Sequence, residues 1–394
     1  MVLYVLRYVQ PSVHYMTDAP YYMPDRAIDQ FSSLIWCERF REPGEFSLYM
    51  RATPELLEYF YDRELLIVRP DTNKAMIPES VILTTSAENG NYLKISGRSA
   101  ESALNHRVIM QTGSWTASTG TAEQAIAYYA VQNITRDFYY HPGDGEQTWN
   151  TLRYLPFMRY AAPDNRESTF PERIEAQPFS QNLGEFVSST CKACGYGYDV
   201  SFDKAAGEMV LRVYRGTDRS LNQSVHSPVI FSRDFCNLGD TEYRRDRTSY
   251  RNYVYIAGEG EGKDRVINSA SSVSVDENDP YYNRAMGMTR REAFVDAKSV
   301  SSNSSGIDRD PVKYLNLLYG IARDKAEESK EEISFTGSAL PGGQFLYRRD
   351  YFLGDTVSAR NEYGINGTGV ISEVTEVFDE TGHTVVPTIS EWRT

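Results

Sequence analysis

The sequence has few of the residues that most often carry catalysis or bind metals. Its 394 residues include five histidines and four cysteines. No apolar run reaches the ~18 residues that a transmembrane helix needs. The first residues, Met-Val-Leu-Tyr-Val-Leu-Arg, lack the basic-then-apolar layout of a signal peptide. We therefore expect a protein that is made and folded in a reducing cytoplasm and does not insert into a membrane.

Positive charge is also scarce. Lys and Arg number 41 against 54 Asp and Glu, which gives a formal net charge of -13. Proteins that hold nucleic acid by its phosphates need clustered Lys and Arg. We therefore expect this chain to repel DNA instead of gripping it.

The histidines form no catalytic or metal-binding pattern. None of them lies in a His-x-x-x-His or His-Glu pair, and no Gly-x-Ser-x-Gly elbow occurs in the chain. We expect surface or loop positions for all of them: His14, His106, His141, His226 and His383. The sequence accordingly predicts no catalytic residue, no metal ligand and no cofactor-binding residue.

Two of the cysteines, Cys191 and Cys194, form a Cys-x-x-Cys pair. Such a pair occurs in redox dithiols and as half of a zinc site, but a second pair at ligand spacing is missing. Residues of one apolar stripe recur here at helical spacing: Leu183, Phe186, Val187, Thr190, Cys191 and Cys194. Both sulfurs should therefore lie on the buried side of an amphipathic helix, and we expect core packing before zinc or redox use.

A strand is predicted at Tyr253–Ala257. Its two tyrosines fall on one face, and Val254 and Ile256 fall on the other. Because both sets are apolar or aromatic, we expect the strand to be covered on both faces.

The loop after this strand invites comparison with a phosphate-binding loop. Three alternating glycines precede Lys263: Gly258, Gly260 and Gly262. A phosphate loop needs Gly and Ser or Thr at two positions that here hold Ala257 and Asp264. Glu259 and Glu261 would also repel a phosphate. We therefore expect a flexible, acidic loop.

Paired carboxylates are the remaining catalytic possibility, because a glycosidase needs only two acids across a cleft. Glu42, Glu45 and the Glu259–Glu261 loop are candidates. No spacing singles out one pair among them, and acidic side chains are mostly solvated surface. We expect no enzymatic activity.

The length and the strand patterns predict a mainly β protein with α+β parts. A chain this long exceeds one simple core, so we expect two to four domains. The short strands near the N-terminus suggest a small barrel or sandwich. Two hairpins are predicted there, around a type II turn at Pro43–Gly44 and around Asn89–Gly90. Thr53 and Pro54 should open a short helix between them.

An α+β domain is predicted near residues 120–228. Its helices are expected at Ala122–Ile134 and around the cysteine pair, and a hairpin that turns at Ala206–Gly207 should pack on the second helix. Residues His141–Gln177 have no sustained period and predict a long ordered loop or insertion.

The last third of the chain is predicted to hold one helix and several strands. Asp310 and Pro311 supply the cap and first turn of the helix. Its buried stripe is expected to contain Val312, Leu315, Leu318, Tyr319 and Ala322. Strands are expected at residues 345–347, 356–360, 369–378 and 384–389, around turns at Asn366–Gly367 and Glu380–Gly382. We expect these strands to pair with Tyr253–Ala257.

Tyrosine is abundant, with 29 residues against 17 Phe and 4 Trp. Tyrosine suits strands that half face solvent and large protein–protein contacts, because its ring is apolar and its hydroxyl is polar. The composition therefore favours interfaces over a small hidden pocket.

Six segments carry a resemblance to a known family. They are Phe31–Met50 (with Trp36 and Arg39), Glu64–Arg69, Leu93–Ser99, Asn252–Gly260, Tyr351–Val357 and Val370–Val374. Their order resembles that of siphophage tail-hub proteins, the tail-associated or tail-tip proteins related in fold to the baseplate hub of contractile phages. The resemblance covers nearly the whole chain, and the order of the motifs carries it.

The resemblance implies a homotrimeric ring that closes the tail tube. Each subunit would have two hub-type β-barrel domains and two smaller peripheral α+β domains. The first barrel would span residues 1–115, and a peripheral part would span 116–228. The second barrel would combine 229–268 with 335–394, and an inserted helical and loop domain would span 269–334.

The resemblance also implies partners and a location. The partners would be further copies of the chain, a distal tail protein, the tape measure protein, and receptor-binding or tail fibre proteins. DNA would pass through the lumen without specific binding, and the protein would lie at the tail tip of the virion after assembly in the host cytoplasm. Two alternatives stay open: a cell-wall-degrading tail enzyme that uses a carboxylate pair, and a host-glycan-binding module that uses exposed tyrosines.

Overall fold

The computed structural model describes residues 1–8, 22–61, 64–86, 90–111, 114–135, 138–140, 147–149, 158–271, 286–303, 307–340 and 344–393. The chain forms two compact units. The first consists of Met1–Thr241 and Thr336–Thr394, and the second is Glu242–Phe335. The division into four domains stays a prediction.

A large, mainly antiparallel sheet dominates the first unit and confirms the mainly β class. Its strands are β1 (Leu3–Tyr8), β2 (Tyr22–Ile28), β3 (Ser33–Arg39), β4 (Glu45–Arg51), β5 (Leu65–Val68), β6 (Ala75–Ser86), β7 (Gly90–Ser99), β13 (Ile230–Ser232), β14 (Leu238–Asp246), β18 (Glu332–Ala339), β19 (Thr356–Arg360), β20 (Asn366–Asp379) and β21 (Gly382–Arg393). The order is β14-β18-β21-β20-β3-β4-β7-β6-β5-β1-β2, and β19 joins β20 to β13. The ends of β14 and β18 continue into the second unit.

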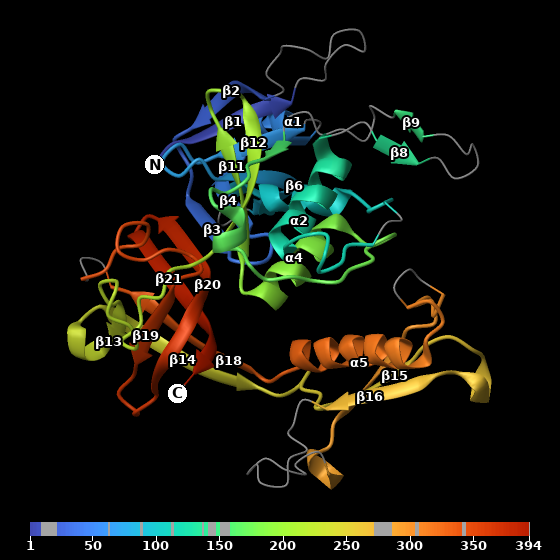
Figure 1. The fold of residues 1–394 in the computed structure, drawn as a ribbon. Coiled ribbons are helices and arrows are strands. Elements are labelled where there is room, and N and C mark those ends of the chain that lie inside the picture. Colours follow the sequence, from blue (N-terminus) through green and yellow to red (C-terminus); the bar gives the residue numbers. More distant parts are fainter. Residues whose placement is uncertain are drawn as a thin grey trace. The chain divides into compact units, whose positions relative to one another are not determined.

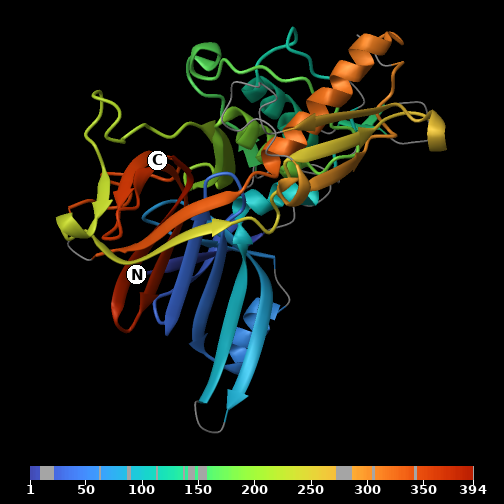
Figure 2. The ribbon, with the colours of Figure 1, turned by 90° about the horizontal axis from the view of Figure 1, so that it is seen from below.

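Both predicted N-terminal hairpins are present. In Figure 2 the light-blue strands β6 and β7 extend as a long hairpin beyond the neighbouring strands, and Gly90 begins β7 with a left-handed φ of 76°. The short helix α1 (Pro54–Tyr61) also forms as predicted. The backbone N–H of Leu56 donates to the hydroxyl of Thr53 at 3.2 Å.

The turn of the β3–β4 hairpin differs from the prediction. A type II turn needs a left-handed residue at the position of Gly44, and Gly44 does not have a positive φ. Glycine is needed there for another reason, because a Cβ on Gly44 would lie 2.1 Å from the carbonyl oxygen of Cys37. The close approach of the two hairpin strands, not the turn type, excludes a side chain.

The strands from the two ends of the chain meet in this sheet. Strand β20 pairs antiparallel with β3, from Glu373 opposite Arg39 to Phe378 opposite Leu34. The prediction that the C-terminal strands pair with Tyr253–Ala257 is therefore wrong. The predicted turn at Asn366–Gly367 is also displaced, because these residues begin β20 and the chain turns at Gly364, whose φ is 79°.

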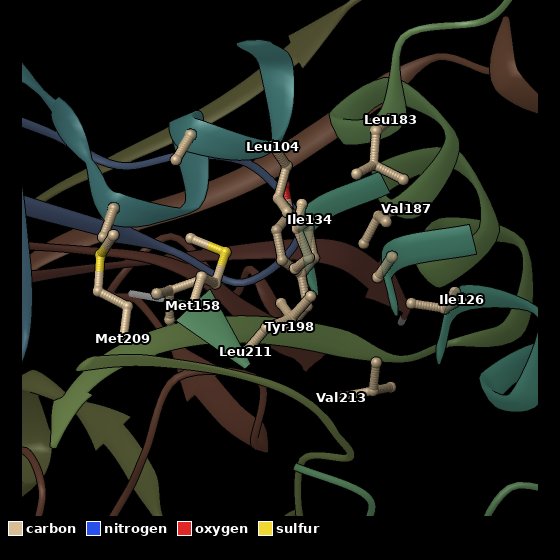
Figure 3. Close-up of a cluster of buried hydrophobic side chains, with 14 of the residues drawn as sticks. Leu104, Ile126, Ile134, Met158, Leu183, Val187, Tyr198, Met209, Leu211 and Val213 are labelled. Atoms are coloured by element: carbon tan, nitrogen blue, oxygen red, sulfur yellow. The ribbon is translucent and has the colours of Figure 1, made fainter. Parts of the chain in front are cut away.

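A second layer of the first unit packs two helices on a small sheet. The helices are α2 (Ala122–Ala130), which continues into a π-helical turn, and α4 (Leu183–Cys194). The sheet has the order β10 (Met158–Tyr160), β12 (Glu208–Tyr214) and β11 (Gly197–Asp203), and the β11–β12 hairpin turns at Gly207 as predicted. Figure 3 shows Met209 and Leu211 of β12 in one cluster with Leu183 and Val187 of α4.

The remaining short elements of this layer connect its main parts. They are the 3₁₀ helix Ala100–His106, strands β8 (Phe138–Tyr140) and β9 (Gln147–Trp149), and helix α3 (Arg166–Thr169). The prediction of one long loop at His141–Gln177 falls partly on residues 141–146 and 150–157, outside the described residues. In the described part of that segment, β9, β10 and α3 interrupt the loop.

The second unit is a three-stranded sheet with one long helix on it. Its strands have the order β16 (Ile267–Ser271), β15 (Tyr253–Ala257) and β17 (Glu292–Asp296). Helix α5 (Pro311–Glu328) runs along β15 and β16 (Figure 1). As predicted, the carboxylate of Asp310 caps the helix, accepting from the backbone N–H of Val312 at 2.8 Å. No helix among the described residues is both long and apolar enough to cross a membrane.

The predicted buried stripe of α5 is wrong in three of its five positions. Val312, Leu315 and Tyr319 are 66%, 39% and 46% exposed. The helix instead buries a row with a spacing of four residues: Tyr314, Leu318, Ala322 and Ala326. Such a row is inclined to the helix axis, which is how one ridge of a helix packs diagonally on a surface. Small residues inside this row hid it, because the sequence pattern weighs large apolar side chains.

Candidate functional site

The most densely connected polar group in the first unit lies where β3 meets β20. We call Glu38, Arg69, Arg348 and Glu376 the central charge network. Glu38 lies on β3 and Glu376 on β20, while Arg69 follows β5 and Arg348 lies in the loop before β19. Two strands from opposite ends of the chain and two loops thus supply its four side chains.

Arg69 is the most buried member, with 2% of its surface exposed. Its Nη1 donates to Glu376 Oε1 at 2.7 Å, and its Nη2 donates to Asp71 Oδ2 at 2.8 Å. The guanidinium also lies 5.4 Å from the ring centre of Trp36 and 5.3 Å from that of Phe378. Two carboxylates and two aromatic faces therefore replace the water that this charge loses on folding.

Arg348 joins the two glutamates of the network. Its Nη2 donates to Glu38 Oε1 at 2.6 Å, and its Nη1 donates to Glu376 Oε1 at 2.8 Å. The backbone of Arg348 is left-handed, with a φ of 62°, which a residue other than glycine adopts at a cost of about 1–3 kcal/mol. The two buried ion pairs hold this loop residue in its strained conformation.

The ionisation of Glu38 indicates whether the network is structural or catalytic. Burial disfavours the ionised carboxyl, but the positive charges of Arg348, Lys74 and Arg69 outweigh burial and hold the pKa of Glu38 below its usual value. Trp36 Nε1 adds a hydrogen bond of 3.0 Å to this carboxylate. An ionised, fully partnered glutamate is not poised to donate a proton at neutral pH. The network fastens the two halves of the sheet together.

A small polar cavity adjoins the network. It has a volume of about 10 Å³, enough for one water molecule, and Glu38, Lys74, Asp199 and Glu101 contribute to its lining. Lys74 Nζ lies 2.7 Å from Asp199 Oδ2. Burial raises the pKa of Glu101, with the charge of Lys74 opposing it. The cavity is too small for a substrate.

A larger open hollow of about 310 Å³ lies along α2. Its lining consists of Gln124, Ala127, Tyr128, Val131, Gln132 and Arg166. Its only cationic side chain, Arg166, is paired: Nε lies 2.7 Å from Oε2 of the buried Glu123. The hollow therefore offers an anion no unpaired charge from its described lining.

The Cys-x-x-Cys pair lies on α4 as predicted. Cys191 is fully buried and Cys194 is half-buried. Burial raises the pKa of both thiols, that of Cys194 to about 11, so both are protonated at neutral pH. Within the described residues, no group of three or more His, Cys, Asp or Glu side chains is placed to hold a metal ion.

The histidines in the described residues are on the surface, as predicted. His106 and His226 are exposed, and His14 and His141 lie outside the described residues. His383 stacks on Phe378 with ring centres 4.1 Å apart, and its Nε2 lies 3.0 Å from Glu376 Oε2. This histidine therefore extends the central charge network to the surface.

The candidate carboxylates are dispersed. Glu42 and Glu45 belong to the first unit, whereas Glu259 and Glu261 belong to the second. Glu42 is exposed, and Glu45 accepts from Arg39 Nη2 at 2.9 Å. No pair of them is isolated from solvent as a glycosidase acid must be.

Hydrogen bonds anchor the start of the glycine loop, and the flexibility of the loop stays a prediction. Glu259 Oε1 accepts from the backbone N–H of Ser302 at 3.0 Å, and Arg265 Nε donates to Gly258 O at 3.0 Å. A Cβ on Gly258 would lie 2.3 Å from the hydroxyl of Tyr314. Gly258 is therefore a packing glycine.

Sequence reasoning missed the central charge network. Arg69 and Glu376 are 307 positions apart, and nothing in the local pattern of either residue indicates a partner. The available signal was a polar residue inside an otherwise apolar strand, such as Glu38 in β3, since a buried charge is seldom left without a partner.

Comparisons with known proteins agree with the fold. The sequence profile of a family described as Siphovirus ReqiPepy6 Gp37-like protein matches residues 22–389. Among curated proteins, none matches the chain.

Solved structures of similar fold include three tail proteins. The 43 kDa tail protein of prophage MuSo2 from Shewanella oneidensis has a TM-score of 0.50 at 11% identity, covering 92% of this chain and 94% of that one. The tail protein from Neisseria meningitidis MC58 has a TM-score of 0.48 at 12% identity, with 93% of each chain covered. The prophage tail protein gp18 from Listeria monocytogenes EGD-e has a TM-score of 0.43 at 10% identity, covering 98% of this chain and 94% of that one. The first likeness shows a shared fold over nearly the whole of both chains.

Proposed function

The chain belongs to the Siphovirus ReqiPepy6 Gp37-like family, and on that basis we propose that it forms the structural hub of a phage or prophage tail tip. The family match over residues 22–389 is the observation that carries this proposal. The chain is a tail component of the virion, and its role is structural.

The architecture of the first unit supports a role in which the protein transmits force within the tail. The large sheet of the first unit joins strands from both ends of the chain through β3 and β20. The central charge network fastens this junction with ion pairs that are shielded from salt by burial. A hub must transmit force between the tube and the host-facing parts, and such a junction resists separation of the two halves.

We further propose three copies of the chain around the tail axis. Closed rings need large self-contacting surfaces, which the 29 tyrosines suit. The ring would contact a distal tail protein and the tape measure protein on the tube side, and receptor-binding or fibre proteins on the outside. The net charge of -13 would let DNA slide through the lumen without adhering.

The proposed role is not enzymatic. The buried carboxylates Glu38 and Glu376 each accept from at least one arginine, and the candidates Glu42 and Glu45 are exposed to solvent. Cell-wall hydrolysis would then require another protein of the tail.

Electron cryo-microscopy of intact tails tests the proposal. Particles that carry the chain should show three copies around the tail axis at the tip. Particles from a deletion of its gene should lack the tip, and expression of the wild-type chain from a plasmid should restore it. A single copy away from the axis, or complete tips in the deletion strain, would refute the proposal. Release of soluble fragments from peptidoglycan by the purified chain would refute the non-enzymatic part.

A further inference from the structure

In the described residues, one face of the sheet in the second unit is partly open to solvent. Helix α5 covers the face that holds Val254 and Ile256, and both of these side chains are fully buried. The expectation that β15 is covered on both faces is confirmed only in part, because on its other face Ala257 is 2% exposed whereas Tyr253 and Tyr255 are half-buried. On the other face Phe294 and Ile267 are 63% and 62% exposed.

The pairing registers define the open face row by row. Tyr253 of β15 lies between Ser271 of β16 and Glu292 of β17. In the next row Tyr255 lies between Ser269 and Phe294. Two tyrosines and one phenylalanine therefore lie side by side on a flat surface, with small hydroxyl residues along one edge.

Polar groups surround these rings. The guanidinium of Arg290 lies 3.6 Å from the ring centre of Tyr253, and its Nη2 donates to the hydroxyl of Tyr255 at 2.9 Å. Arg290 also pairs with Glu292, and the hydroxyl of Tyr253 lies 2.9 Å from Oγ of Ser269. These contacts fix the positions of the two tyrosine rings and place hydrogen-bonding groups at their rims.

The size of the open face decides which class of ligand fits it. Three strands of five residues cover roughly 17 by 10 Å. A stable protein partner buries about 800 Å² on each side, several times this area. A few sugar rings fit the face, because one side of a sugar ring is a layer of C–H groups that stacks on an aromatic ring while its hydroxyls reach outward.

The charges on the face decide what kind of glycan it suits. Arg290 is paired with Glu292, and on the same face Arg265 is paired with Asp296. Because each cation has its own carboxylate, the face has no surplus positive charge for a nucleic acid or an acidic polysaccharide.

We propose that the open face of β15, β16 and β17 binds a neutral oligosaccharide. Phe294 is the stacking platform, because its ring is the most exposed of the three. Glu292, Arg290 and Ser269 hydrogen-bond the sugar hydroxyls. This binding site goes beyond the hub role and does not depend on it, since it can be measured on the purified chain.

Affinity electrophoresis of the purified full-length chain tests the proposal. The gels contain dextran, mannan, galactan or β-glucan as neutral probes, and heparin or hyaluronate as anionic probes. We expect at least one neutral polysaccharide to retard the wild-type chain. Phe294→Ala should weaken that retardation by about tenfold or more, as truncation of a central aromatic contact does. Phe294→Trp should retain it.

Tyr319→Ala is the matched control, because Tyr319 is an exposed aromatic residue of the same unit on α5, which packs on the opposite face of the sheet. It should leave the retardation unchanged. Phe294 is mostly solvent-exposed, so its truncation should not alter the far-UV circular dichroism of the chain. The proposal is overturned if no neutral polysaccharide retards the wild-type chain, if the two alanine variants behave alike, or if anionic polymers bind more tightly than neutral ones.

Discussion

Replacing Arg69 with methionine should destabilise the first unit more than any other single loss of charge in the described part of the chain. Methionine keeps most of the length and apolar volume of the side chain but removes its ion pairs. Glu376, which is 3% exposed, would lose its contact with Arg69 Nη1 and keep those with Arg348 and His383. Removing one partner of a buried pair typically costs about 3–5 kcal/mol. Because two partners of Glu376 remain, we expect a loss of about 3 kcal/mol.

Urea unfolding followed by tryptophan fluorescence measures this loss of stability in the first unit. All four tryptophans, Trp36, Trp115, Trp149 and Trp392, belong to the first unit. Trp36 is fully buried against Arg69, so its emission reports directly on the network. The midpoint of the transition should fall while its slope is retained.

The matched control is Arg98→Met. Arg98 pairs with Glu79 through two contacts, Nε at 2.8 Å and Nη2 at 2.6 Å, but both side chains are on the surface, 43% and 32% exposed. Exposed pairs of this kind contribute about 0–1 kcal/mol. The two variants thus lose the same kind of contact at different depths.

A double-mutant cycle with Glu376→Gln isolates the pair. Once Arg69 is gone, loss of the Glu376 charge removes fewer interactions, so the double variant should be more stable than the sum of the singles by about 1–3 kcal/mol. Our reasoning is refuted if Arg69→Met costs no more than Arg98→Met, or if the two network substitutions are additive.

Two further predictions concern a buried acid and two glycines. Burial raises the pKa of Glu101 above its value in the unfolded chain, so its stabilising contribution is complete at low pH and is lost as pH rises through the folded-state pKa. The melting temperature of Glu101→Gln should therefore equal that of the wild type near pH 4 and exceed it at pH 7. The same difference in melting temperature at both pH values would contradict this. Gly44→Ala should lower the free energy of unfolding by about 1–3 kcal/mol, because its Cβ would clash with the Cys37 carbonyl. Gly320 in α5 has open space around it, so Gly320→Ala should stabilise the helix by about 1 kcal/mol. Calorimetric scans measure both changes. The same sign for both glycine variants would be inconsistent with the packing described.

Local elements of the fold could be predicted because their causes are local. Gly90 begins β7 with a positive φ, which glycine adopts without strain, and Asp310 caps α5 with its own carboxylate. Such causes depend on only a few neighbouring residues in the sequence. Two turn predictions failed because the glycine has a non-local cause. A Cβ on Gly44 would lie 2.1 Å from the carbonyl oxygen of Cys37, and a Cβ on Gly367 would lie 2.4 Å from that of Arg393.

Long-range pairing could not be predicted in this way. The pairing of β20 with β3 depends on which strand edges are free after the whole chain has folded, and alternation of apolar residues is common to every strand. The partial exposure of Tyr253 and Tyr255 on β15 was missed because tyrosines suit both a core and a surface. The candidate site was harder to predict than the fold. Glu38, Arg348 and Glu376 form a site only through their contacts with one another, and those contacts join distant parts of the chain.

The central charge network also bears on the order in which the first unit folds. During synthesis β3 and β4 form before β20 exists, so one edge of β3 is temporarily unpaired. An unpaired edge is a template for pairing with other chains, and an inward-pointing charge is one device that blocks it. Glu38 places such a charge on β3, and its partner Arg348 lies 310 positions later. A wrong strand on this edge would bury Glu38 without its ion-pair partner Arg348, whereas β20 arrives together with Arg348 and completes the ion pairs. The same network that fastens the two halves of the sheet therefore selects which strand may join them.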